Sequence, residues 1–170
     1  KVTQLMGGLS SIATSVSAEE LGRTLAQNLH AQFIPLLAPA VVSNSRTRNT
    51  LLKEESISQV LEVSRRADIA LVGVGSHGSA SSEEVLKQFR LNKSEHEMAA
   101  STYAGDISAR FYDANGRSVS NEMDNRVVGL TLEELANIPH VIGVAAGNEK
   151  AQGVLGAARA GLIDTLVTDV

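Results

Sequence analysis

The sequence predicts an α/β domain in which a mostly parallel sheet is flanked by helices and carries an antiparallel excursion. Short runs of Val, Ile, Leu and Ala alternate with segments of helical periodicity along the chain. Apolar runs without strict alternation are typical of parallel strands that are covered on both faces. The 170 residues contain no internal repeat and no low-complexity linker, so we expect residues 1–170 to form one domain.

Five apolar runs are predicted to be buried strands, at residues 2–6, 33–37, 69–74, 141–145 and 166–168. Between residues 105 and 129 the pattern changes, because Ile107, Ala109 and Phe111 alternate with polar residues. The dipeptide Asn115-Gly116 is typical of a tight turn, and a second short run follows at residues 127–128. We interpret residues 105–129 as the antiparallel excursion.

Helix starts are predicted where Ser or Thr is followed three residues later by Glu or Gln, because the two side chains then satisfy each other's backbone donors. The pattern occurs at Ser17/Glu20, Ser56/Gln59, Ser81/Glu84 and Thr131/Glu134. Apolar residues recur at helical spacing in three places, at Leu21, Leu25 and Leu29, at Ile57, Val60 and Leu61, and at Ala151, Val154, Leu155 and Ala158. Gly161 is predicted to end the last helix.

The composition excludes several function classes. With no Cys, the chain has no disulfide, no thiolate metal site and no Cys nucleophile. The formal charge is −4 and Lys and Arg form no cluster, which argues against nucleic-acid binding by this chain alone. The four histidines lack metal-type spacing, no G-x-S-x-G nucleophile motif occurs, and no apolar run approaches membrane-spanning length. We therefore expect neither a metal, a cofactor nor a membrane partner.

Glycine-rich loops follow the predicted strands at the edge where open α/β sheets bind ligands. After the first strand, Gly7, Gly8, Leu9 and Ser10 offer a backbone cradle for phosphate or carboxylate, although a plain strand-to-helix turn explains them equally well. After the third strand, residues 73–78 spell G-x-G-x-x-G, the pattern of a dinucleotide site. That match is weak, because the dinucleotide motif belongs to the first β-α-β unit and two strand-helix units precede this one.

A third loop, residues 146–150, follows the fourth predicted strand and opens the last predicted helix. Free backbone amides and the positive end of the helix dipole favour an anion there. Lys150 in the first turn opposes that dipole, and an anion bound between the lysine and the amides would compensate. A solvated surface lysine is the alternative.

Acidic and basic side chains mix in the antiparallel excursion. Carboxylates accept hydrogen bonds from hydroxyl groups and arginines donate to phosphate, so the mixture suits a phosphorylated polyol. The residues are Asp106, Asp113, Glu122 and Asp124, with Arg110, Arg117 and Arg126. Asp113 itself is better explained by the turn that follows it.

Five segments occur in a characteristic order along the chain. They are Gly7-Gly8-Leu9-Ser10, residues 67–76 (ADIALVGVGS), residues 105–113 (GDISARFYD), residues 125–129 (NRVVG) and residues 146–151 (AGNEKA). Together they resemble the sugar-binding domain of SorC-type bacterial transcriptional regulators. The resemblance covers essentially the whole chain, and the shared order makes it specific.

The resemblance implies a fold similar to ribose-5-phosphate isomerase, glucosamine-6-phosphate deaminase and CoA transferases. It implies an effector site whose first phosphate loop is Gly7, Gly8, Leu9 and Ser10 and whose floor is Gly73, Gly75 and Ser76. In this site Asp106 would accept sugar hydroxyls, and Gly147 and Lys150 would bind an anionic group. Arg126 would be a further cation of the pocket. Ala146 stands where the family often has a glycine, which bears on the width of the pocket.

The resemblance also implies a function. We expect a cytoplasmic, non-enzymatic domain that binds a phosphorylated sugar and forms homo-oligomers. An N-terminal helix-turn-helix domain outside this chain would bind operator DNA, so we expect the chain to be part of a longer protein. A phosphosugar isomerase or deaminase on the same fold, with Asp106 as a base, is the alternative, and a nucleotide-binding domain is a third class.

Overall fold

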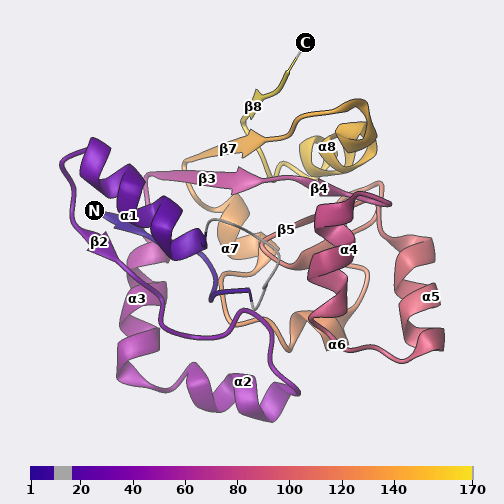
Figure 1. Ribbon diagram of the computed structural model, residues 1–170, viewed down its shortest axis with the longest axis horizontal. Coiled ribbons are helices and arrows are strands. Elements are labelled where there is room, and N and C mark those ends of the chain that lie inside the picture. The colour runs from indigo at the N-terminus through magenta and orange to yellow at the C-terminus, as the bar shows by residue number, and fades with distance from the viewer. Residues whose placement is uncertain (10–16, 170) are drawn as a thin grey trace.

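The computed structural model describes residues 1–9 and 17–169, and it confirms the predicted class, with parallel strands packed against helices beside a small antiparallel sheet (Figure 1). The helices are α1 (Ala18–Asn28), α2 (Ser45–Leu51), α3 (Glu55–Arg65), α4 (Ala80–Lys87), α5 (Lys93–Thr102), α6 (Asn121–Asp124), α7 (Leu132–Ala136), the 3₁₀ turn η1 (Asn148–Lys150) and α8 (Ala151–Arg159). The strands are β1 (Val2–Thr3), β2 (Phe33–Ile34), β3 (Ile69–Gly73), β4 (Gly75–Ser76), β5 (Gly105–Ile107), β6 (Arg110–Tyr112), β7 (His140–Val144) and β8 (Thr165–Val167). Within residues 1–9 and 17–169, no helix is long and apolar enough to cross a membrane.

In the described residues, the strands form three short sheets. β1 pairs with β2 in parallel, and β3, β7 and β8 form a second parallel ladder in that order. Gly73 at the end of β3 pairs with Val144 at the end of β7, so both strands finish at the same edge. After one residue, Val74, the chain enters the antiparallel sheet β4-β5-β6, where Gly75 pairs with Asp106. This topology brings the ends of β3 and β7 next to β4 and β5.

Strands β3 and β7 contribute one face to the core, whereas all three residues of β8 are exposed. Ala70, Val72 and Val141 are buried, whereas Ile69 and Leu71 are 61% and 55% exposed. The prediction that these strands are covered on both faces is therefore wrong for the described residues. Successive side chains of a strand point to opposite faces, so the alternation of exposure along β3 identifies the single covered face.

The predicted apolar stripe of helix α1 is largely exposed. Leu21, Leu25 and Leu29 are between 37% and 61% exposed, and the buried residue of the helix is Ala26. The helix packs so closely on β2 that a Cβ atom on Gly22 would lie 2.5 Å from the ring of Phe33. In α3 the predicted stripe is confirmed, because Ile57, Val60 and Leu61 are all buried.

Helix α8 also buries a different face from the predicted one. Its buried residues are Gly153, Gly156 and Ala157, while Leu155 is exposed. Small residues are required here because α8 lies against β4 and β5, and a Cβ atom on Gly153 would collide with the carbonyl oxygen of Gly75. The predicted end of the helix is confirmed by Gly161, which has a φ of 65°.

Two of the four predicted caps are confirmed. The Ser17 hydroxyl accepts a hydrogen bond from the backbone N–H of Glu20 at 3.1 Å. Thr131 and Glu134 form a reciprocal capping box, with distances of 3.0 and 2.8 Å. These interactions fix the starts of α1 and α7 where the sequence predicts them.

The other two predicted caps are wrong, and in both the helix starts earlier. Helix α3 begins at Glu55, so Ser56 lies inside its first turn. Helix α4 begins after Ser79, whose hydroxyl accepts from the backbone N–H of Ser82. The backbone of Ser79 is extended, and its side chain caps the helix. The hydroxyl of Ser81 is therefore not used as a cap and can form a hydrogen bond elsewhere.

The antiparallel excursion contains a hairpin that the sequence pattern does not predict. Ser108 and Ala109 have φ values of 52° and 60°, so the predicted continuous strand is broken into β5 and β6 by a tight turn. The predicted turn further along is confirmed. The carboxylate of Asp113 accepts backbone hydrogen bonds from Asn115 and Arg117, and Gly116 has a φ of 79°.

Arg110 on β6 is a buried structural residue. Its guanidinium donates to the carbonyl oxygens of Leu130 at 2.7 Å, Asp124 at 2.9 Å and Gly129 at 3.2 Å. Burial lowers the pKa of Arg110, and the Asp124 carboxylate, 3.4 Å away, opposes that shift. The side chain connects β6 to residues 124–130 through these hydrogen bonds, so Arg110 has a structural role.

Candidate functional site

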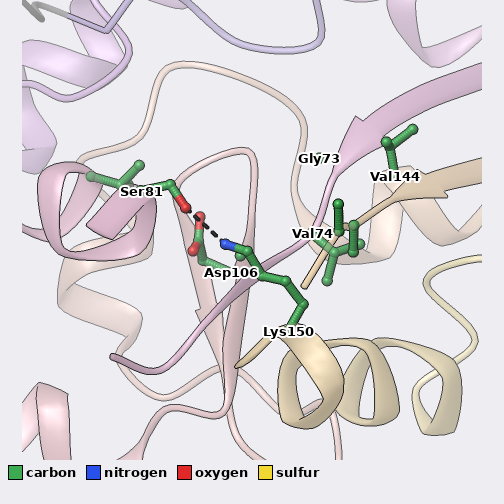
Figure 2. Close-up of a pocket in the computed structure, with 10 residues that line it drawn as sticks. Gly73, Val74, Ser81, Asp106, Val144 and Lys150 are labelled. Atoms are coloured by element: carbon green, nitrogen blue, oxygen red, sulfur yellow. Dashed lines mark hydrogen bonds between the residues drawn. The ribbon is translucent and has the colours of Figure 1, made fainter. Parts of the chain in front are cut away.

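A pocket of about 310 Å³ lies where β3 and β7 end, beside α4 and η1 (Figure 2). Its lining combines apolar and polar residues, and consists of Gly73, Val74, Gly75, Ser81, Val85, Asp106, Val144, Ala145, Ala146 and Lys150. The pocket therefore lies at the carboxyl ends of parallel strands, where open α/β sheets place their ligands.

The passage from β3 to β4 shapes the floor of the pocket. Gly75 pairs with Asp106 across the antiparallel sheet. A Cβ atom on Gly75 would collide with the Asp106 carboxylate and with the hydroxyl of Ser82. Glycine is thus required for the backbone of β4 to lie directly against this carboxylate.

Asp106 supplies a buried carboxylate at the pocket. The residue is 6% exposed, and the hydroxyl of Ser82 donates to its Oδ1 atom at 2.6 Å. Burial raises the pKa of Asp106, while the Ser82 hydrogen bond and the positive charge of Lys150 oppose that rise. Within the described part of the chain, Ser82 is the only side chain that hydrogen-bonds this carboxylate. Its second oxygen can therefore accept a further hydrogen bond.

Lys150 supplies the positive charge. It is the last residue of η1, and its ammonium donates to the hydroxyl of Ser81 on α4 at 2.9 Å. Figure 2 shows Ser81, Asp106 and Lys150 facing one another across the pocket. An ammonium group has three donors, so Lys150 keeps donors for an anionic ligand group.

The predicted site residues divide into those the pocket brings together and those it does not. Gly73, Gly75, Asp106 and Lys150 line it. Ser76 lies behind it, where its hydroxyl is buried, donates to the carbonyl of Ala104 and accepts from the N–H of Gly153. These two bonds hold β4 between β5 and α8.

Gly147 lies beside the pocket without lining it. Its φ of 98° lets the chain turn into η1, and its N–H donates to the Asp169 carboxylate at 2.9 Å. Its carbonyl accepts from the N–H of Lys150 at 3.0 Å. Gly147 therefore positions the backbone that carries Lys150.

The described residues of the first glycine loop, Gly7, Gly8 and Leu9, do not line this pocket. The N–H groups of Gly7 and Gly8 donate to the carbonyls of Val128 and Ala38, both at 2.9 Å. Leu9 is 37% exposed, and Ser10 lies outside the described residues. A phosphate loop at these residues stays a prediction.

Arg126 lies in a different cavity, of about 370 Å³. Its guanidinium donates to the carbonyls of Val42 at 2.8 Å and Phe89 at 2.7 Å, and it lies over the Phe89 ring. These contacts hold together segments that are distant in sequence. A role for Arg126 in effector binding also stays a prediction.

Sequence reasoning missed the serines at the start of α4. Ser81 contacts Lys150, and Ser82 contacts Asp106. The available signal is the density of hydroxyls in residues 79–82 directly after the glycine loop, but helix capping explains those hydroxyls equally well. The apolar part of the lining, Val74, Val85 and Val144, was also missed as part of a site.

Replacing Asp106 by Asn is expected to stabilise the folded protein at neutral pH. Because the folded-state pKa of Asp106 is raised, the wild-type protein loses stability as pH rises from about 4 through that raised pKa. Asparagine cannot ionise, so we expect its melting temperature at pH 7 to exceed that of the wild type by about 2–4 °C, equivalent to about 1 kcal/mol. The difference should shrink when melting is measured at pH 4, and a constant difference across this range would contradict the assignment.

The fold and the pocket together define a class of α/β domains that hold a small-molecule site at the carboxyl ends of parallel strands. Residues 1–170 match the family model described as "Putative sugar-binding domain". The chain belongs to this family, the sugar-binding domains of SorC-type transcriptional regulators.

Similar proteins are bacterial regulators. The chain is 32% identical over 171 residues to the transcriptional regulator LsrR of Enterobacter sp. (strain 638), a match that covers 99% of this chain and 50% of that protein. The crystal structure of the full-length sorbitol operon regulator SorC from Klebsiella pneumoniae has a TM-score of 0.87 at 29% identity, over 98% of this chain and 54% of that one. The structure of a DeoR family transcriptional regulator from Listeria monocytogenes has a TM-score of 0.82 at 33% identity, and the match covers 96% of this chain and 64% of that one. The chain spans about half the length of the curated relatives it matches, which are regulators and do not favour the enzyme alternative.

Proposed function

We propose that this chain is the effector-binding domain of a bacterial transcriptional regulator and that its effector is a phosphorylated sugar. The observation that carries the proposal is that Lys150 and Asp106 line the same pocket at the end of β3. Lys150 offers donors to an anionic group and Asp106 accepts hydroxyl groups, which is the donor set that a phosphorylated polyol requires. Membership of the sugar-binding family supports the same ligand class.

We further propose that residues 1–170 form the effector domain of a longer protein, in which a helix-turn-helix domain on the N-terminal side, outside this chain, binds operator DNA. Occupation of the pocket alters DNA binding or the assembly of a homo-oligomer in the bacterial cytoplasm. The net charge of −4 on this chain supports the assignment of DNA binding to another domain, because a DNA-binding surface is basic. The regulator names of the relatives support it as well.

A thermal-shift panel tests the ligand class. Ribose 5-phosphate and glucosamine 6-phosphate are expected to raise the melting temperature more than ribose and glucosamine at the same concentration. A ligand present at 100 times its dissociation constant adds about 2.7 kcal/mol to the stability, which corresponds to about 5–10 °C for a chain of this size. Sodium sulfate at equal ionic strength is the control for a general anion effect.

The same panel separates the alternatives. Equal shifts from phosphorylated and unphosphorylated sugars, or no shift from either, would rule out a phosphorylated effector of this class. Product analysis after incubation with ribose 5-phosphate and glucosamine 6-phosphate tests the enzyme alternative, for which we expect no turnover. Turnover of either compound would replace the sensor proposal with an enzymatic one.

A further inference from the structure

Three serine hydroxyls at the start of α4 connect the two ends of the pocket. Lys150 Nζ donates to Ser81 Oγ at 2.9 Å. Ser81 Oγ lies 3.2 Å from Ser79 Oγ, and Ser79 Oγ donates to Ser82 Oγ at 3.0 Å. Ser82 Oγ then donates to Asp106 Oδ1 at 2.6 Å. An unbroken chain of hydrogen bonds thus runs from the ammonium to the carboxylate, and we call the three hydroxyls the serine relay.

The direction of every hydrogen bond in the serine relay is fixed by its ends. An ammonium group can only donate and a carboxylate can only accept. Ser82 therefore uses its single proton on Asp106, and Ser79 uses its proton on Ser82. Ser81 is left as the donor to Ser79. Chains with one direction polarise each bond in turn, and the short final distance agrees with a charge-assisted bond.

The part of the serine relay next to Asp106 is buried. Ser82 is fully buried and Ser79 is 5% exposed. Gly75 leaves the space for the last link, since a Cβ atom there would collide with both Ser82 and Asp106. The Ser81 end opens on the pocket together with Lys150, where an arriving ligand meets it.

We propose that the serine relay couples Lys150 to Asp106 and makes the pocket select ligands that carry an anionic group and a hydroxyl donor together. An anion that draws the ammonium away from Ser81 weakens the polarisation of the relay at its far end. The buried carboxylate then needs a replacement donor, which a ligand hydroxyl supplies and a simple anion does not. Ser82 is the residue that positions the carboxylate, and Ser79 acts through Ser82. The selectivity rests on the proposed function, whereas the coupling itself exists without any ligand.

The ligand-free test is a titration of the Asp106 carboxyl carbon by ¹³C NMR. Ser79→Gly removes the middle hydroxyl of the serine relay and is compatible with the start of α4, because Gly is well tolerated at an N-cap. We expect Asp106 to titrate at higher pH in S79G, because Ser82 then donates more weakly to the carboxylate, and to return to the wild-type titration in Ser79→Thr. Lys150 on η1, Tyr112 on β6 and Tyr103 after α5 also interact electrostatically with Asp106, and all three are unchanged in these variants.

The matched control is Ser64→Ala, because Ser64 is a fully buried serine whose hydroxyl bonds to Gln4 and Val60, outside the serine relay. We expect the Asp106 titration of S64A to equal that of the wild type. A wild-type titration in S79G would overturn the proposal, since the carboxylate would then sense Ser82 alone. Should S79G fail to fold, Ser81→Ala removes the first link and carries the same expectation.

The binding test uses ribose 5-phosphate, which has both groups, and sulfate, which has only the anion. S79G is expected to lower the ratio of the ribose 5-phosphate affinity to the sulfate affinity roughly 3- to 10-fold, the worth of one hydrogen bond, because sulfate binding then no longer weakens the hydrogen bond to Asp106. An unchanged ratio of the two affinities would overturn the selectivity. If the wild type binds no phosphorylated sugar, the proposed function fails, while the NMR titration still decides the coupling by itself.

Discussion

A Lys150→Met variant is expected to lose the thermal shift that phosphorylated sugars produce. Hydrogen bonds to a charged group contribute about 1.5–3 kcal/mol, so the affinity should fall roughly 10- to 100-fold. Methionine keeps most of the length and apolar surface of the lysine stem, so the change removes the charge and the donors. The fold should persist, because the bond from Lys150 to the Ser81 hydroxyl is exposed to solvent. Titration calorimetry with ribose 5-phosphate measures the loss, and circular dichroism checks the fold.

The matched control for this variant is Lys93→Met. Lys93 is the first residue of α5, and its side chain is 91% exposed beside Glu97. The control removes the same charge from the molecule while leaving the pocket intact, so its affinity should equal that of the wild type. Lys150→Arg should retain part of the affinity, because the charge remains while the donor geometry changes. Equal affinities for K150M and the wild type would remove Lys150 from the site.

Replacing Arg110 by Met is expected to destabilise the protein strongly. The carbonyls of Asp124, Gly129 and Leu130 would lose their donor, and the Asp124 carboxylate would lose its ion pair. Removing one partner of a buried ion pair costs about 3–5 kcal/mol, which lowers the melting temperature by about 6–20 °C for a chain of this size. Thermal denaturation followed by circular dichroism measures this change in melting temperature.

Arg66→Met serves as the control for the Arg110 variant. The Arg66 side chain is 76% exposed and pairs with Glu62 at one helix end, so its removal should change the stability by less than about 0.5 kcal/mol. If R110M does not fold, Arg110→Lys keeps the charge and one donor direction, and it should melt between R110M and the wild type. A melting temperature within about 2 °C of the wild type for either Arg110 variant would contradict the structural role.

Much of the candidate site follows from local sequence. Gly73 and Gly75 sit where an apolar run ends, and Lys150 sits where the next run leads into a helix. Both positions are readable because parallel strands bring their carboxyl ends to one edge. Asp106 is predicted as a hydroxyl acceptor from its residue type and from the family resemblance. The pocket brings these four residues together.

The serines show why the rest could not be predicted. Ser79 and Ser81 are both acceptable N-cap residues, and the favourable Glu spacing belongs to Ser81. The structure selects Ser79, and Ser81 then meets a lysine 69 residues away. No local rule contains that partner, since it depends on how α4 and η1 pack around the end of β3.

The α/β class, the order of the main strands and the loops at the strand ends follow from the amino-acid sequence, because hydrophobic period, caps and turn residues act over a few positions. Which faces are buried and which polar groups meet depends on the tertiary fold. The leucine stripe of α1 is largely exposed while Ala26 is buried, and the fold joins Ser82 to Asp106 across 24 residues. Both features depend on contacts between segments that are distant in sequence. These contacts are determined by how the helices and strands pack together, and local sequence patterns do not contain them.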